Sequence, residues 1–154
     1  MIKVMFVCHG NICRSPMAEY MFIDMIKKKG IISHFLVSSS ATSYEEIGNG
    51  VHYGTKRILN NLGIDCNGKK AIKLEKSDYD KYDYFIGMDD YNVLNMQRLF
   101  NTDKKIYKLL EFNNTNRDVK DPWYTGNFDE TFEDIKDGLN AFLNYLLKKH
   151  NIWT

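Results

Sequence analysis

The sequence has few cysteines, almost no net charge and no long apolar run, and each shortage excludes a class of protein. Three cysteines among 154 residues are an odd and small number, which argues against a disulfide framework and suits a reducing cytoplasm. A formal net charge of +1 gives no global field that would attract nucleic acid or an anionic membrane surface. We therefore expect a cytoplasmic protein without nucleic-acid or membrane partners, in which any anion site is built locally.

Membrane spans and metal-ligand patterns are also missing. No stretch approaches the roughly 18 apolar residues that a membrane span needs. The apolar run at the N-terminus is too short, and wrongly flanked, for a signal peptide. The cysteines form no CxxC pair and the four histidines fall into no zinc-ligand spacing, so we expect no zinc site.

Apolar runs and helical periodicities alternate along the chain, whose length suits one domain spanning residues 1–154. Strands are predicted at 2–7, 35–39, 84–88 and 105–109, with a weaker fifth strand at 70–74. Helices are predicted at about 15–29, 51–62, 89–100 and 129–149, the first capped by Ser15 and stopped by Gly30. This alternation predicts an α/β fold with a parallel sheet.

The loop after the first predicted strand carries the chemistry of the chain. Residues 8–16 read Cys-His-Gly-Asn-Ile-Cys-Arg-Ser-Pro, so five residues separate Cys8 from Arg14. Open α/β sheets bind ligands at the carboxyl ends of strands, and a helix N-terminus there offers unpaired N–H groups to an oxyanion. Gly10 and Asn11 tolerate the backbone angles that such a wrapped loop requires.

The residue types in this loop suit phosphoryl transfer. The field that holds a phosphate also stabilises a thiolate, so Cys8 is the predicted nucleophile. Arg14 presents a planar fork that binds two phosphate oxygens, and Ser15 is expected to donate its hydroxyl to the sulfur. Alone, Cys8 would be read as a core thiol and Arg14 as a solvated side chain. Their spacing around Gly10 and Asn11 argues against that simpler interpretation.

Residues 8–16 resemble the signature loop of the low-molecular-weight protein tyrosine phosphatases, with only His9 departing where an apolar residue is common. The resemblance covers the whole chain in length and element order. It implies a phosphotyrosine phosphatase I-like domain with flavodoxin-like winding, in which helices flank a four-stranded parallel sheet on both faces. The implied phosphate-binding loop consists of His9, Gly10, Asn11, Ile12, Cys13, Arg14 and Ser15.

The resemblance also implies an activity and its partners. It implies hydrolysis of phosphotyrosine through a cysteinyl-phosphate intermediate, without a metal or any other cofactor. The expected substrates are phosphotyrosine-containing proteins or small aromatic phosphates. Phosphate-like oxyanions are expected to inhibit the enzyme. The expected oligomeric state is a monomer, with weak dimers as an alternative.

A distant carboxylic acid completes the expected machinery. A phenolate leaving group needs a proton and the intermediate then needs a base, and one carboxyl group can serve in both steps. Asp121 precedes Pro122, which restricts its conformation, and the aromatic faces of Trp123 and Tyr124 follow. Composition alone would favour a plain turn before the last helix, whereas the resemblance implies that Asp121 is the general acid.

Supporting residues are assigned from the same resemblance. Ser39, Asn11 and Ser15 are expected to brace the loop. Cys13 is either a redox partner for Cys8 or a buried packing thiol, and both interpretations stay open. The expected substrate wall consists of Ile12, Tyr44, Trp123 and Tyr124. Tyr44 or Glu45 stands where a tryptophan often walls the cleft in the family, with Tyr44 the better aromatic substitute. Ser38, Ser40 and the Asn67-Gly68 pair depart from the family pattern, the last standing where a histidine often supports the loop asparagine.

Two other functions stay open at this point. An arsenate reductase of the same fold shares the loop, but such enzymes normally use two more downstream cysteines and only Cys66 is present. A non-catalytic phosphate-binding module is the other alternative, although it would leave Cys8, Arg14 and Asp121 without a use.

Overall fold

The computed structural model describes residues 1–154 and is built on a four-stranded parallel sheet with strand order β2-β1-β3-β4. The strands are β1 (Ile2–Cys8), β2 (Phe35–Ala41), β3 (Tyr84–Gly87) and β4 (Ile106–Lys108). β1 lies between β2 and β3, so both of its edges are hydrogen-bonded. This central position explains the nearly continuous apolar run at the N-terminus, because both faces of such a strand are buried.

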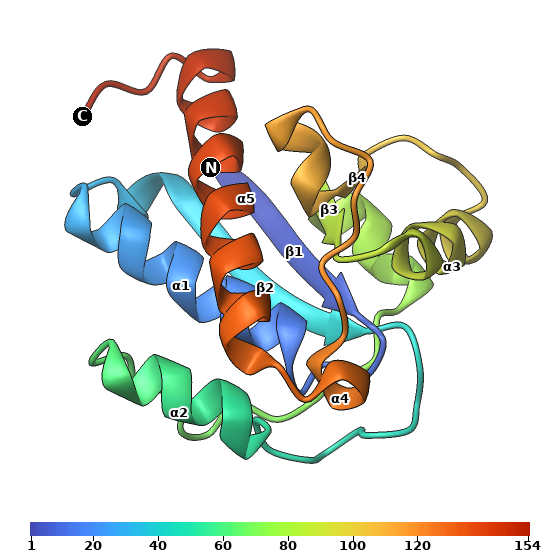
Figure 1. The fold of residues 1–154 in the computed structure, drawn as a ribbon. Coiled ribbons are helices and arrows are strands. Elements are labelled where there is room, and N and C mark those ends of the chain that lie inside the picture. Colours follow the sequence, from blue (N-terminus) through green and yellow to red (C-terminus); the bar gives the residue numbers. More distant parts are fainter.

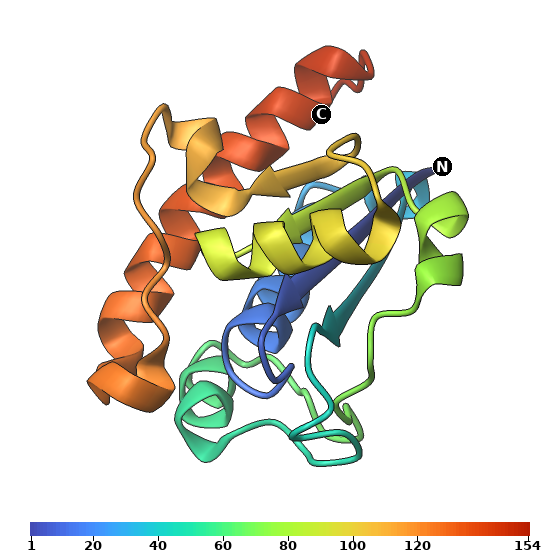
Figure 2. The same ribbon diagram turned by 90° about the vertical axis from the view of Figure 1, so that its right-hand side faces the viewer.

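Helices cover both faces of the sheet. The helices are α1 (Arg14–Lys28), α2 (Tyr53–Asn61), α3 (Asp90–Phe100), α4 (Pro122–Thr125) and α5 (Phe128–Lys149). Short 3-10 helices occupy Ile32–His34, Lys76–Lys81 and Leu109–Asn113. Figures 1 and 2 show α1 and α5 on one face and α3 on the other. The predicted α/β architecture with four parallel strands is therefore confirmed.

The alternation of side chains along β1 joins the two halves of the core. Phe6 belongs to the cluster under α1 and α5, where its ring lies 5.6 Å from Phe22 and 6.2 Å from Phe142. Met5 and Val7 point to the opposite cluster, under α3. Burying large apolar side chains contributes roughly 1.5–3 kcal/mol each. The strand that ends at Cys8 is therefore anchored along its whole length.

Several element boundaries differ from the sequence-based predictions. Residues 70–74 form only isolated bridges, Ala41 with Lys73 and Gly50 with Lys70, and not a fifth strand. α1 begins at Arg14, so Ser15 is not its cap, and its hydroxyl lies beside Cys8 instead. The four-residue helix α4 was not predicted. No helix combines the length and the apolar character that crossing a bilayer would require.

Candidate active site

The loop that leaves β1 surrounds the sulfur of Cys8 with donors. The backbone N–H groups of Asn11 and Ser15 donate to Cys8 Sγ at 3.3 and 3.4 Å, and Ser15 Oγ lies 3.0 Å from it. The wrap depends on Asn11, whose φ of 59° lies in the left-handed region that asparagine tolerates better than most residues. Donors at the start of α1 favour an anion, so this position suits a thiolate.

Arg14 is the second charged group of the loop and is almost completely buried. Its Nη1 donates to Asp89 Oδ2 at 2.7 Å and to the Val119 carbonyl at 2.9 Å, and its Nη2 lies 3.4 Å from Asp121 Oδ2. Burial alone would lower the pKa of Arg14, but Cys8 and the two carboxylate partners raise it overall. The guanidinium is therefore held charged and oriented at the loop.

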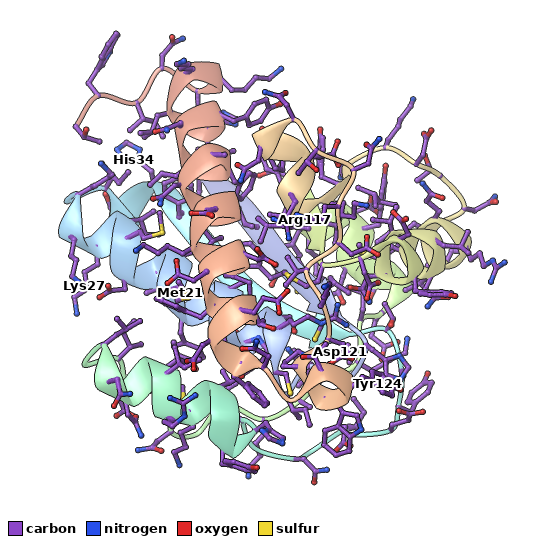
Figure 3. The ribbon with its side chains drawn as sticks, in the orientation of Figure 1. Met21, Lys27, His34, Arg117, Asp121 and Tyr124 are labelled. Carbon is purple, nitrogen blue, oxygen red and sulfur yellow. The ribbon has the colours of Figure 1, made fainter.

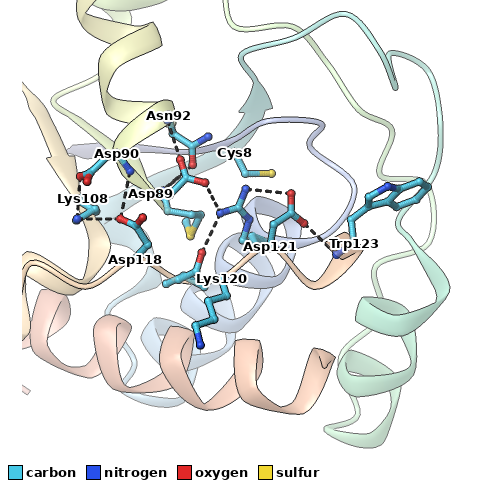
Figure 4. A network of polar contacts seen from close by, with 12 residues as sticks. Cys8, Asp89, Asp90, Asn92, Lys108, Asp118, Lys120, Asp121 and Trp123 are labelled. Carbon is cyan, nitrogen blue, oxygen red and sulfur yellow. Dashed lines mark hydrogen bonds and ion pairs between the residues drawn. The ribbon is translucent and has the colours of Figure 1, made fainter. Parts of the chain in front are cut away.

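Asp121 lies at the start of α4, where its Oδ1 accepts a hydrogen bond from the Trp123 N–H at 3.0 Å. Its other carboxylate oxygen, Oδ2, lies 3.4 Å from Arg14 Nη2. Figure 4 shows Asp121 beside Cys8. Figure 3 places Asp121 and Tyr124 together at the end of α5 where α4 lies. The structure thus brings Cys8, Arg14 and Asp121 around one pocket.

The segment that carries Asp121 is fixed to the body of the protein by ion pairs and hydrogen bonds. Lys108 Nζ donates to Asp118 Oδ1 at 2.9 Å and to Asp90 Oδ1 at 2.8 Å, as Figure 4 shows. Arg117 Nη1 lies 2.9 Å from Asp134 Oδ2 on α5. These contacts give the segment its course without a strand or a long helix of its own.

A chain of polar side chains lies behind the loop. Asn11 Nδ2 donates to Ser15 Oγ at 2.7 Å and to Ser39 Oγ at 2.9 Å. Asn11 Oδ1 accepts from the Ile72 N–H at 3.1 Å. The backbone of Ile72 therefore holds Asn11 in this protein. The resemblance had placed Asn67-Gly68 where a histidine would often hold this asparagine.

The walls of the pocket differ in part from the expectation. The residues that line it are Cys8, His9, Gly10, Ile12, Cys13, Arg14, Glu45, Glu46, Asp121, Trp123 and Tyr124. Tyr44 is not among them, because its ring is exposed and lies 5.0 Å from Lys73 Nζ. Glu45, the other residue considered at that position, lines the pocket together with Glu46, whose Cγ lies 3.2 Å from where a Cβ on Gly10 would lie.

His9 and Cys13 belong to the same loop but differ in exposure, since His9 is exposed and Cys13 is buried. His9 points outward and its Nε2 lies 2.8 Å from Glu45 Oε2. Cys13 is buried, and burial followed by the charge of Cys8 raises the pKa of its thiol. All three cysteines are free thiols, and Cys66 is buried and does not line the pocket.

Several residues at the site were missed by the sequence analysis. Asp89 caps α3 and binds Arg14, while Glu19 and Lys69 lie behind the loop. Nothing local marks them, since an acidic residue before a helix or a lysine in a loop is ordinary. Nowhere do three or more His, Cys, Asp or Glu side chains gather as metal ligands.

Comparisons with known proteins agree with this geometry. Residues 3–152 match the family described as low molecular weight phosphotyrosine protein phosphatase. The low molecular weight protein-tyrosine-phosphatase YfkJ of Bacillus subtilis is 39% identical, over 99% of this chain and 100% of its own. PtpA of Staphylococcus epidermidis is also 39% identical, over 99% of this chain and 98% of its own.

Solved structures of the same family share this fold. The crystal structure of YfkJ superimposes with a TM-score of 0.92 at 40% identity, covering 97% of this chain and 96% of that one. SP-PTP from Streptococcus pyogenes gives a TM-score of 0.87 at 37% identity, covering 99% and 97%. The chain therefore belongs to the low molecular weight protein tyrosine phosphatase family.

Proposed function

We propose that this protein hydrolyses phosphotyrosine in proteins, with Cys8 as nucleophile, Arg14 as phosphate clamp and Asp121 as general acid and base. The observation that carries the proposal is the ring of donors around Cys8 Sγ, with a buried guanidinium and a carboxyl group in the same pocket. One domain of residues 1–154 holds the complete machinery, and we take it to act as a monomer in the cytoplasm.

The first chemical step transfers the phosphoryl group to sulfur. The Cys8 thiolate attacks phosphorus in line, the bond from phosphorus to the phenolic oxygen breaks, and Asp121 gives its proton to that oxygen. The loop N–H groups and Arg14 bind the three equatorial oxygens, on which charge is spread in the transition state. Arg14 Nη1 is already held by Asp89 and Val119, so Nε and Nη2 are the donors left for the phosphate, and Nη2 exchanges its 3.4 Å contact with Asp121 for a phosphate oxygen.

The second step releases the phosphate. Asp121, now a carboxylate, removes a proton from water, and the resulting oxygen attacks phosphorus while the P–S bond breaks. Cys8 leaves as a thiolate, which the N–H groups of Asn11 and Ser15 and the Ser15 hydroxyl stabilise. The same carboxyl group thus serves both steps with no net change in its protonation.

The rim of the pocket supports an aromatic substrate. Ile12 lines it from the loop, and Trp123 and Tyr124 line it from α4 with 58% and 83% of their surfaces exposed. Exposed aromatic faces beside a phosphate site are suited to stacking on a phenyl ring. Tyr44 is not part of this wall, so the proposal assigns aromatic contact to the α4 side.

The direct test is a panel of phosphotyrosine, phosphoserine and phosphothreonine peptides, incubated with a chelator. Wild type should release phosphate from phosphotyrosine alone, and Cys8→Ser should reduce turnover to background with an unchanged circular dichroism spectrum. Full activity of Cys8→Ser, or activity that the chelator removes, would contradict the proposal. Thioredoxin-dependent reduction of arsenate without peptide hydrolysis would indicate the reductase instead.

A further inference from the structure

A buried pair of opposite charges lies directly behind the catalytic loop. The side chains of Lys69 and Glu19 are only 10% and 11% exposed, with Nζ 3.8 Å from Oε1. Lys69 Nζ also donates to the Ser39 carbonyl at 2.9 Å. Removing two such ions from water is unfavourable, and their mutual attraction offsets only part of that cost. The position of the pair, two hydrogen bonds behind Asn11, points to an effect on the loop.

The hydrogen bonds that connect the pair to Cys8 have only one consistent direction. Ser39 Oγ donates to Glu19 Oε1 at 2.5 Å, because an ionised carboxylate can only accept. Ser39 Oγ can therefore accept one of the Asn11 Nδ2 hydrogens, while Ser15 Oγ accepts the other. The hydroxyl hydrogen of Ser15 is then free to donate to Cys8 Sγ.

We propose that Lys69 and Glu19 are a positioning pair that sets how readily Cys8 forms its thiolate. Glu19 takes the Ser39 hydrogen and so keeps Ser39 as an acceptor for Asn11, whose amide group in turn leaves the Ser15 hydrogen for Cys8 Sγ. Lys69 neutralises the charge of Glu19 so that it does not oppose the thiolate. Neither residue touches the substrate. The inference rests on the proposed role of Cys8 as nucleophile and extends it to residues outside the pocket.

The charged and titratable groups around the pair support this arrangement. Burial raises the pKa of Glu19, which the Ser39 hydrogen bond and the charge of Lys69 oppose. Burial lowers the pKa of Lys69, which Glu19 and Cys8 oppose. Burial, followed by the charge of the adjacent Glu19, raises the pKa of Tyr20.

The cations that face Cys8 come from two different elements. Arg14 lies on α1, and Lys69 lies in the segment after α2, while Cys13 faces Cys8 from within the loop. Removing Lys69 would leave Glu19 either as an uncompensated anion or as a neutral acid. As an anion Glu19 opposes the thiolate, and as an acid it no longer fixes the hydroxyl of Ser39. Both states make Cys8 less reactive.

Removing Lys69 and removing Glu19 are therefore predicted to have opposite effects on how readily Cys8 forms its thiolate. In Lys69→Met the cation is gone, so the thiolate is disfavoured. In Glu19→Gln the amide oxygen still accepts from Ser39, whereas the charge of Lys69 is no longer compensated, so the thiolate is favoured at every pH at which Lys69 keeps its proton. A purely structural role would move both variants in the same direction or leave both unchanged. Lys70→Met, at the exposed neighbouring position, is the matched control.

The experiment measures the rate at which iodoacetamide alkylates Cys8 between pH 4 and 9, with Cys8→Ser protein as the blank. The pH of half-maximal reactivity should rise by about one unit in Lys69→Met, a tenfold slower reaction on the acid side, and fall by about as much in Glu19→Gln. Lys70→Met should match wild type. Shifts of one sign in both variants, or no shift, would overturn the proposal.

A third variant covers the case in which Lys69→Met does not fold. Glu19→Gln/Lys69→Met removes both charges together, a change that buried pairs often tolerate. The pH dependence of Cys8 alkylation in this double variant should match that of wild type. A pH dependence equal to that of Glu19→Gln would overturn the proposal. The readout needs no phosphorylated substrate. A wild type without phosphatase activity would therefore refute the proposed function, whereas unmoved alkylation curves refute the positioning pair.

Discussion

Replacing Asp121 by Asn should remove the proton donor while preserving its surroundings. The Asn side chain keeps an oxygen that can accept from the Trp123 N–H, the contact that caps α4 at 3.0 Å. It loses the ion pair with Arg14, whose Nη2 lies 3.4 Å from the Asp121 carboxylate. That loss leaves the guanidinium more available to phosphate, so binding of the substrate should not weaken.

Asp121 is also the proposed base of the second step, but kcat/KM reports only the step that breaks the P–O bond, because hydrolysis of the intermediate comes after it. General acids contribute about 10²–10⁴-fold, and at about 1.36 kcal/mol for each factor of ten this is roughly 2.7–5.4 kcal/mol of barrier. The loss should be largest for substrates whose leaving oxygen is most basic, such as phosphotyrosine. It should be smallest for a nitrophenyl ester, whose phenolate leaves without a proton.

The assay is kcat/KM over a series of aryl phosphates of increasing leaving-group acidity. Wild type should show a shallow dependence and Asp121→Asn a steep one. Asp129→Asn is the matched control, because it makes the same change on an exposed side chain at the start of α5. An equal loss for every leaving group would refute the role of Asp121 as general acid and indicate a purely structural effect.

Two further predictions concern stability. Gly54→Ala would place a Cβ 2.6 Å from the ring of Phe128, so it should lower the unfolding free energy by about 1–3 kcal/mol, seen as a lower urea midpoint at unchanged slope. A gain, as at an open helical position, would contradict this packing. Burial raises the pKa of Tyr84 to about 12, so the unfolded chain ionises first and stability falls from about pH 10 to pH 12. Tyr84→Phe should flatten that fall in urea titrations against pH, and an unchanged slope would show that other groups cause it.

The parts of the molecule that could be predicted are those encoded by local patterns. The apolar run of β1 and the break at Gly10 lie within ten residues of each other, and they place a loop at the carboxyl end of a central strand. The stripe of α5 is equally local, and the helix begins within one residue of the prediction, at Phe128. Such patterns determine where the helices and strands lie. Because strands and helices alternate along the chain, few sheet topologies remain possible.

The remaining features depend on tertiary placement. Asp89 and Glu19 act on the loop from positions whose sequence context is ordinary for a helix cap and a helix interior. Residues 70–74 resemble a strand because three of the five are apolar, but their backbone binds Asn11 and the end of β2 instead of joining the sheet. Tyr44 was chosen by position along the chain, and only folding shows that Glu46 lies beside Gly10 instead.

The nucleophile and the acid belong to parts of the molecule with different protection against opening. Cys8 ends a strand bonded on both edges and covered on both faces, whereas Asp121 lies in a connecting segment at the rim. Local unfolding of the segment that carries Asp121 should therefore be more frequent than unfolding of the strand that carries Cys8. A molecule in which that segment has unfolded keeps its reactive sulfur and its anion cradle but has lost its proton donor. It would then accept a phosphoryl group from a donor with a good leaving group and hydrolyse the cysteinyl phosphate slowly, because the base that activates water is displaced.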